Sequence, residues 1–206
     1  MIDCGADWLG RLHRIQPEAI VLTHAHPDHA WGLKNGAPCR VYATERTWCY
    51  LKRFPLRDRA LVEPRTPFSI QDIVFEAFPV EHSLRAPAVG YRITAGRTSI
   101  FNVPDLVSIY EQHEALSDIR VYVGDGASLR RPIIRESGGS LIGHASVRTQ
   151  LGWCRQEGVQ KALITHCGSQ IVGADSRIVN ADLRALSLEQ GVEARLAFDG
   201  FEVLLH

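Results

Sequence analysis

The sequence lacks net charge, C-x-x-C pairs and any hydrophobic run long enough to cross a bilayer. Its 23 Lys and Arg residues balance 23 Asp and Glu residues, which argues against a strong non-specific grip on nucleic acid or anionic membrane. Every apolar run falls short of the ~20 residues of a transmembrane helix. The first residues lack the basic start and apolar stretch of a signal peptide. We therefore expect neither a membrane nor a nucleic acid as partner, although a local basic patch could form at Arg130, Arg131 and Arg135.

The cysteines are odd in number and dispersed, at positions 4, 39, 49, 154 and 167. This spacing is typical of reduced, buried thiols rather than of a disulfide framework, and it favours the cytoplasm. The chain of 206 residues is 45% hydrophobic, which is enough to bury a core without disulfides. Because no linker-like stretch interrupts it, we predict one domain over residues 1–206.

Short β-branched runs alternate with helix-like segments, and this order predicts a layered α/β domain. The expected strands cover residues 19–23, 40–43, 73–80, 88–94, 98–102, 120–124, 161–165, 194–198 and 202–205. The expected helices cover residues 7–12, 44–52, 109–116, 147–157 and 181–190. Ser108 and Ser146 precede two of these helices as N-caps, and Gly158 and Gly191 follow two of them as C-terminal glycines.

The most informative segment is the apolar strand that ends at Thr23 and is followed by His-Ala-His-Pro-Asp-His. Residues two apart point to the same side of an extended chain, so His24 and His26 can converge on one cation. Pro27 turns the chain, which leaves Asp28 and His29 free to reach a neighbouring cation. Imidazole and carboxylate are ligands that zinc, manganese and iron prefer. The segment therefore predicts a metal site.

The H-A-H-P-D-H run, together with the I-D-C-G of residues 2–5, resembles the H-x-H-x-D-H signature of the metallo-β-lactamase superfamily. The resemblance extends over the whole chain and implies a four-layer αββα sandwich with two metal ions at one edge. Zinc is the expected ion, with manganese or iron as alternatives. Met1 stands directly before the I-D-C-G strand, whereas members usually have two or more strands there. We therefore expect a chain short of its N-terminal strands, or a first sheet whose edge is covered in a homodimer.

The resemblance also assigns the remaining ligands. His82 is followed by Gly90-Tyr91-Arg92-Ile93. This order is similar to the H…G-Y-R-I stretch in the branch that contains RNase Z and the cyclic phosphodiesterases of phosphonate degradation. Asp105 matches the bridging aspartate, although the usual hydroxyl residue after it is Leu106 here. His166, in Thr-His-Cys-Gly, matches the final ligand. By this resemblance one ion is held by His24, His26 and His82, the other by Asp28, His29 and His166, and Asp105 bridges them.

Three further positions, in addition to the metal ligands, are candidates for a role in catalysis or substrate binding. Paired cations lower the pKa of a bound water toward ~7, so the implied reaction is hydrolysis, and Asp28 would orient the water. His144, in Gly-His-Ala-Ser, matches a histidine that assists the leaving oxygen in the phosphodiesterase branch; the alternative is a histidine that only caps or packs. Asp125 is either a support for the site or a turn residue. Arg85 is a candidate phosphate ligand or a solvated loop residue.

The sequence favours a small phosphodiester, cyclic or linear, as substrate. Only residues 83–104 separate His82 from Asp105, which leaves no room for the tRNA-gripping arm of the related nucleases. The first alternative is a lactone, ester or thioester hydrolase of the same fold. The second is an accessory protein, because Asp125-Gly-Ala, Gly-His-Ala-Ser and Phe-Asp-Gly also resemble a superfamily protein of pyrroloquinoline quinone biosynthesis.

Overall fold

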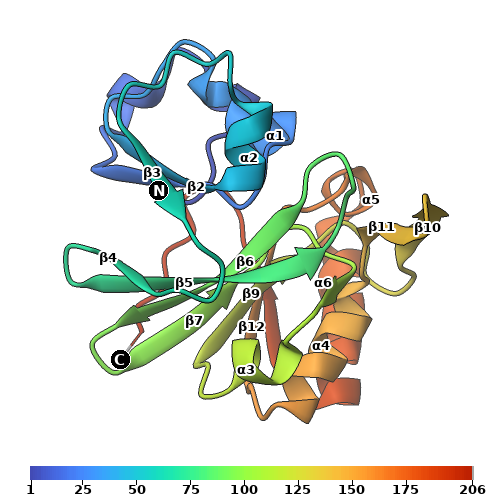
Figure 1. Cartoon of the computed structure of the whole chain (residues 1–206). Helices are drawn as coiled ribbons and strands as arrows, with labels where there is room; N and C mark the ends of the chain where they lie inside the picture. The colour runs from blue at the N-terminus through green and yellow to red at the C-terminus, as the bar shows by residue number, and fades with distance from the viewer. Residues whose placement is uncertain (206) are drawn as a thin grey trace.

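The computed structural model describes residues 1–205 and arranges them around two sheets (Figure 1). The small sheet is parallel throughout and has the order β1-β2-β3, with Ile2 bridging to Val21 at its edge. The large sheet has eight strands in the order β13-β12-β9-β7-β6-β5-β4, with β8 paired to β5. The strands of the small sheet are β1 (Ala19–Val21), β2 (Arg40–Thr44) and β3 (Arg59–Val62). Those of the large sheet are β4 (Phe68–Ile70), β5 (Ile73–Glu81), β6 (Ala88–Ala95), β7 (Thr98–Asn102), β8 (Ser108–Ile109), β9 (Val121–Asp125), β12 (Lys161–Thr165) and β13 (Glu193–Leu196).

Three apolar cores separate four layers, which confirms the predicted αββα sandwich. The first core lies between the large sheet and helices α3, α4 and α6, and includes Phe101 and Leu151. The second joins the two sheets through Val21 and Tyr91. The third lies between the small sheet and the helical turns over it, around Leu33. The helices are α1 (Pro27–Ala30), α2 (Glu45–Tyr50), α3 (Gln112–Leu116), α4 (Val147–Gln156), α5 (Ser169–Val172) and α6 (Ser176–Gln190), with 3₁₀ turns η1 (Ala6–Trp8), η2 (Leu12–Arg14) and η3 (Trp31–Leu33).

Strand β5 shows why the large sheet is covered on both faces. Successive side chains of a strand point to opposite faces. Phe75 and Ala77 accordingly pack against the small sheet, whereas Phe78 and Val80 pack in the core beneath the helices. All four side chains are at least 92% buried, as their exposed fractions of 8%, 0%, 1% and 4% show. A strand buried on both faces has a nearly continuous apolar sequence, which is what residues 73–80 contain.

Several predicted elements differ from the observed ones. Residues 202–205 form no strand, and residues 7–12 form 3₁₀ turns instead of an α-helix. Ile109, expected as the start of a helix, pairs with Val80 in β8, so α3 begins only at Gln112. Helix α6 starts at Ser176, five residues before the predicted 181, because Asp175 caps it by accepting from the Arg177 backbone. Among the described residues, no helix is both long and apolar enough to span a membrane.

A two-stranded hairpin stands apart from both sheets and was not predicted. It consists of β10 (Ile133–Ser137) and β11 (Ser140–His144), joined by Gly138 and Gly139, both at positive φ. Its inner strand is tied to the end of β5, where Gly143 N–H donates to the His82 carbonyl at 3.0 Å and Leu141 N–H donates to Glu81 Oε1 at 2.9 Å. The hairpin is therefore fixed beside the carboxyl end of β5.

The carboxyl ends of four large-sheet strands meet at one edge. Strands β12, β9 and β7 are mutually parallel, and β5 is antiparallel to the intervening β6, so β5, β7, β9 and β12 all run in the same direction. Side chains that follow these strands therefore collect at one place. The predicted residues His82, Asp105 and His166 each follow such a strand end, and Asp125 is the last residue of β9.

Candidate metal centre

The first ligand group joins three imidazoles and one carboxylate. His26 Nδ1 lies 2.9 Å from His24 Nε2 and 3.2 Å from His82 Nε2. Asp105 Oδ2 lies 3.4 Å from His24 Nε2 and 3.3 Å from His82 Nε2. Ligands about 2.0–2.1 Å from a tetrahedral zinc ion stand about 3.3 Å apart. The observed separations therefore correspond to the edges of such a tetrahedron.

The second group comes from the short helix α1 and from the loop after β12. His29 Nε2 lies 3.1 Å from His166 Nε2, and Asp28 Oδ2 lies 3.2 Å from His166 Nε2 and 3.7 Å from His29 Nε2. Asp105 Oδ2 is also 3.3 Å from His29 Nε2, so the same oxygen faces both groups. This is the position of a bridging ligand between two neighbouring cations.

Two polar atoms of these groups lack a hydrogen-bond partner among the described residues. Asp105 Oδ1 and His166 Nδ1 are buried and make no hydrogen bond within residues 1–205, although they are only 3.0 Å apart. Burial lowers the pKa of His24 and His82, and it lowers the pKa of His26 to about 4. The rings of this first group are therefore neutral, and neutral rings whose nitrogen lone pairs converge are suited to binding a cation. The donor set thus fits a pair of divalent metal ions.

Asp3 holds the second group in position and was not predicted as a functional residue. Its Oδ2 accepts from His29 Nδ1 at 2.8 Å and from Thr23 Oγ1 at 2.8 Å, while its Oδ1 accepts from Thr23 N–H at 2.7 Å. Burial of His29 opposes its protonation, but the Asp105 and Asp3 carboxylates outweigh that effect and raise its pKa to about 10. A carboxylate on Nδ1 fixes the tautomer that presents Nε2 to a metal.

The first group has a similar support. The backbone oxygen of Gly143 lies 3.0 Å from His82 Nδ1, which leaves His82 Nε2 to face the ligand cluster. Gly143 has φ +125°, and an added Cβ would lie 1.9 Å from the Ile133 carbonyl oxygen. Glycine is therefore required where the hairpin passes His82. The hairpin in this way fixes the orientation of a predicted ligand.

His144 stands beside the ligand groups and is paired with Asp125. Its Nδ1 lies 2.8 Å from Asp125 Oδ2 and 3.7 Å from Asp105 Oδ1. The hydrogen bond to Asp125 raises the pKa of His144, whereas burial raises the pKa of Asp125 itself. Asp125 Oδ2 also accepts from the Leu106 backbone at 3.3 Å, so one carboxylate supports both His144 and the loop that carries Asp105.

Gln150 of helix α4 anchors the end of β9. Its side-chain oxygen accepts from Asp125 N–H at 2.9 Å and from the Tyr122 hydroxyl at 3.0 Å, and its amide nitrogen donates to the Asp125 carbonyl at 2.8 Å. Gln150 is completely buried. A polar residue in the middle of a helix gives no sequence signal for this role, apart from its position on the buried face of α4.

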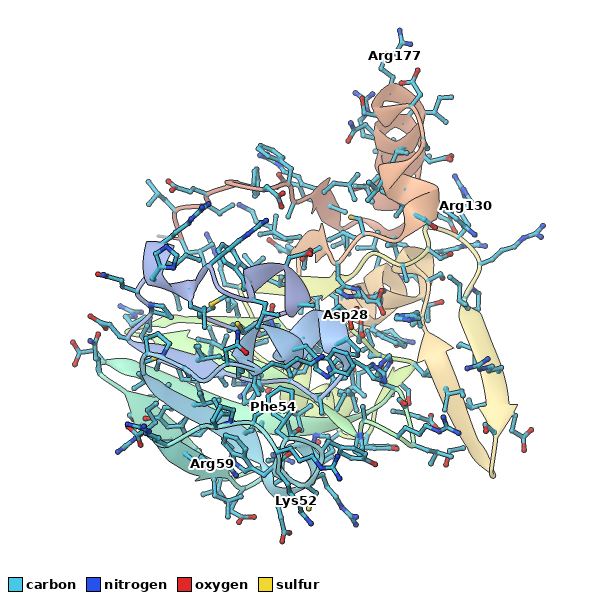
Figure 2. The ribbon with its side chains drawn as sticks, turned by 90° about the horizontal axis from the view of Figure 1, so that it is seen from above. Asp28, Lys52, Phe54, Arg59, Arg130 and Arg177 are labelled. Atoms are coloured by element: carbon cyan, nitrogen blue, oxygen red, sulfur yellow. The ribbon has the colours of Figure 1, made fainter. Side chains whose placement is uncertain are left out.

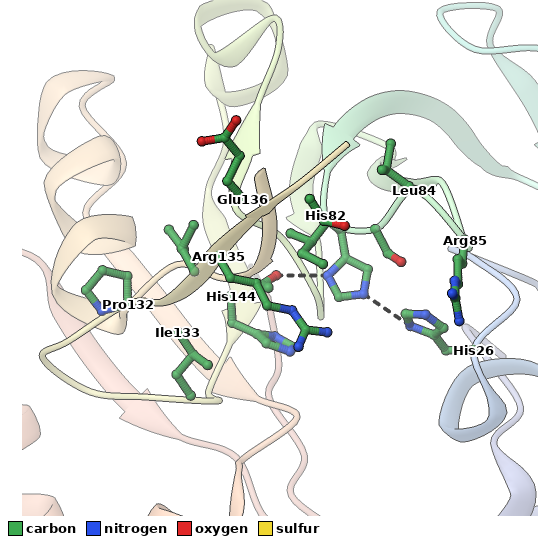
Figure 3. A pocket seen from close by; sticks show the side chains of 14 residues that line it. His26, His82, Leu84, Arg85, Pro132, Ile133, Arg135, Glu136 and His144 are labelled. Atoms are coloured by element: carbon green, nitrogen blue, oxygen red, sulfur yellow. Dashed lines mark hydrogen bonds between the residues drawn. The ribbon is translucent and has the colours of Figure 1, made fainter. Parts of the chain in front are cut away.

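A cavity of about 1030 Å³ opens beside the first ligand group (Figure 3). It is lined by His26, His82 and His144, by residues 83–85 of the β5–β6 loop, and by both strands of the hairpin. Arg85 enters the lining from the loop side, near His26, and Arg135 enters it from the hairpin, near His144 (Figure 3). Neither guanidinium makes an ion pair within the described part of the chain.

The structure brings together all seven predicted metal-binding side chains, and it places His144 and Arg85 at the edge of the same site. Asp28 is the most exposed carboxylate of the set and is labelled near the centre of the ribbon in Figure 2. His166 has φ +50°, an uncommon conformation for a residue other than glycine. What sequence reasoning did not assign were the supporting roles of Asp3, Gly143 and Gln150, and the presence of Arg135 in the cavity.

The fold and the ligand groups define a metal-dependent hydrolase of the metallo-β-lactamase type. The family model described as "Beta-lactamase superfamily domain" matches residues 1–167, and the chain belongs to this superfamily. No curated protein matches the sequence significantly.

Solved structures share the fold at low sequence identity. The metallo-beta-lactamase fold protein YhfI from Bacillus subtilis has a TM-score of 0.74 and 15% identity, over 97% of this chain and 84% of that one. A diphosphatase of the PhnP family has a TM-score of 0.67 and 18% identity, over 100% of this chain and 79% of that one. Human tRNase Z, short form, has a TM-score of 0.58 and 15% identity, over 82% of each chain.

Proposed function

We propose that the protein is a dinuclear metal-dependent phosphodiesterase that acts on a small phosphodiester. The observation that carries the proposal is the arrangement around Asp105, where two ligand groups share one carboxylate oxygen and the His144–Asp125 pair adjoins them. His24, His26 and His82 would hold one cation, and Asp28, His29 and His166 the other, with Asp105 between them. When bound, the two cations would supply Lewis acidity that activates water and stabilises the charge on a reacting phosphoryl group.

The chain's own residues supply orientation and proton transfer. Asp28 is 60% exposed, so its carboxylate can both ligate a cation and orient the attacking water. Since His144 Nδ1 donates to Asp125, its Nε2 is the atom available to protonate a departing alkoxide. An alcohol leaving group has a high pKa and needs such a donor, which favours a phosphodiester with an alkoxide leaving group.

The electrostatics of the cavity support an anionic substrate. Arg85 and Arg135 lie on two sides of its lining without an ion-pair partner in residues 1–205. A guanidinium can bind phosphate oxygens in a bidentate manner. The short interval between β5 and Asp105 contains only a loop and strands β6 and β7, which leaves no arm for a long polynucleotide. A small phosphodiester fits this combination better than precursor tRNA.

The direct test is hydrolysis of bis(p-nitrophenyl) phosphate by protein loaded with zinc, manganese or iron. We expect turnover that disappears on chelation, together with little action on precursor tRNA and only a shallow salt dependence. For a substitution of His144 by asparagine, the matched control is His113→Asn, because His113 is an exposed histidine paired with Glu157 on the surface. Rapid cleavage of lactones or thioesters without any phosphodiester hydrolysis would contradict the proposal and favour the carboxylic-ester alternative.

A further inference from the structure

The hairpin exposes more apolar surface than its structural role requires. Ile133, Ile134 and Leu141 are 48%, 39% and 42% exposed, and Leu84 of the neighbouring loop is 49% exposed. Leu84, Ile133 and Ile134 line one cavity rather than being scattered singly over the surface, whereas Leu141 lies outside its lining. Exposed apolar residues that cluster in this way mark a binding surface.

The strand register divides these side chains between two faces of the hairpin. Ile133 is the pairing partner of His144, and Arg135 is the partner of Ile142, so these four residues share one face. Ile134, Glu136 and Leu141 occupy the opposite face. The face that carries His144 therefore also carries two isoleucines and one arginine. Glu136 also lines the cavity, but it lies on the other face of the hairpin and forms no ion pair with Arg135.

We propose that this face of the hairpin binds an apolar substituent of the substrate, so that the enzyme prefers phosphodiesters with an alkyl or aryl ester group. The inference rests on the proposed phosphodiesterase function and names the substrate class of the same site. The phosphate would lie at the ligand groups, with Arg85 and Arg135 beside it. The substituent would lie against Ile133 and Ile142, which share the hairpin face of His144 and line the same cavity.

Two features make the hairpin suitable as a fixed wall. Its inner strand is held by Gly143 and Leu141 hydrogen bonds to the end of β5, and by the Ala145 N–H, which donates to the Leu106 carbonyl at 2.6 Å. The outer strand β10 pairs only with the inner strand β11. One side of the cavity is therefore bounded by an edge strand that belongs to neither of the two main sheets. A cavity of about 1030 Å³ exceeds what a phosphate and two cations fill, which leaves space for a substituent.

The test uses methyl p-nitrophenyl phosphate and hexyl p-nitrophenyl phosphate, which have the same charge and leaving group. Each buried methylene contributes up to about fourfold in affinity. With only part of the hexyl chain covered, we expect kcat/KM to be about 10-fold or more higher for the hexyl ester, mainly through KM. The double variant Ile133→Ser, Ile142→Ser should reduce this preference to less than about threefold. Leu141→Ser is the matched control, because Leu141 is an exposed residue of the same hairpin on the opposite face and outside the cavity lining.

Binding of hexyl phosphate and methyl phosphate by titration calorimetry provides a readout that needs no turnover. Tighter binding of hexyl phosphate, lost in the double variant and kept in Leu141→Ser, supports the apolar wall even when neither ester is hydrolysed; that result would contradict only the proposed reaction. Equal hydrolysis and equal binding of the methyl and hexyl compounds by the native protein would overturn the inference and leave the proposed function intact. Light scattering tests whether a second copy of the chain covers this face instead. A dimer that the double variant dissociates, with the hexyl preference unchanged, would show that it does and would also overturn the inference.

Discussion

Asp3→Asn should remove one metal ion while leaving the other in place. Asp3 accepts a hydrogen bond from His29 Nδ1 and two from Thr23. An amide at this position keeps the size of the side chain but has a donor where one oxygen was. If the amide turns its nitrogen to His29, it favours the tautomer with a proton on Nε2, the atom that faces Asp105 and His166. If the amide instead turns its nitrogen to Thr23, its N–H faces the backbone N–H of Thr23, and two donors cannot form a hydrogen bond.

The size of the effect follows from these contacts. Loss of a residue that orients a ligand typically lowers metal affinity by about 10–100-fold. That factor corresponds to about 1.4–2.7 kcal/mol at the second group. The first group contains His24, His26 and His82, none of which contacts Asp3 directly, so its affinity should change much less. In the metal-free protein, the loss of charge-assisted hydrogen bonds should cost a further ~2 kcal/mol of unfolding free energy.

Elemental analysis after dialysis against a weak chelator measures the outcome. The native protein should retain about two equivalents of metal and the variant about one, with a lower affinity resolved by competition titration. Asp7→Asn, at an exposed aspartate of the same N-terminal segment, controls for the change in charge. Two tightly held equivalents and unchanged turnover in Asp3→Asn would refute the role assigned to Asp3.

Three further changes test other parts of the site. His144→Asn should retain metal yet lower turnover by roughly 10²–10⁴-fold on diesters with alkoxide leaving groups, and much less with nitrophenolate; equal losses on both would argue against proton donation. Gln150→Leu should lower the unfolding free energy by about 3 kcal/mol or more, because it strands the Asp125 backbone and the Tyr122 hydroxyl; urea denaturation of this variant with an unchanged midpoint would contradict that. Removal of both metal ions should lower Tm by roughly 10–20 °C, since each ion at 100 times its Kd adds about 2.7 kcal/mol; a melting curve insensitive to chelator would count against the ligand assignment.

The ligand residues could be predicted because each stands where an apolar strand ends. His24, His26, Asp28 and His29 are also close in sequence, so one turn of the chain brings them together. His82 and His166 were assigned through their resemblance to a family pattern. Asp3 gave no comparable signal, because its partner His29 lies 26 positions away and its own conformation, with φ +54°, depends on the fold.

Elements on the surface were harder to predict than those of the core. Strands β5, β6 and β12 contain the apolar residues that burial requires, and they were found at nearly their observed bounds. The hairpin was missed because every residue of β10 is exposed, so its sequence shows no alternation between buried and solvated positions. Strands β3 and β4 are only four and three residues long, too short for a clear pattern. Residues 202–205 resembled a strand in composition, yet they pair with no other strand.

The ligands are divided between the two halves of the sandwich. His24, His26, Asp28 and His29 follow the small sheet, whereas His82, Asp105 and His166 follow strands of the large one. A bound cation pair would therefore hold together the two sheets, which otherwise pack through the apolar core around Val21 and Tyr91. In the absence of metal, the layer formed by residues 1–62 would be the first to exchange its amide protons, and loading of the centre and closure of the sandwich would be a single cooperative event.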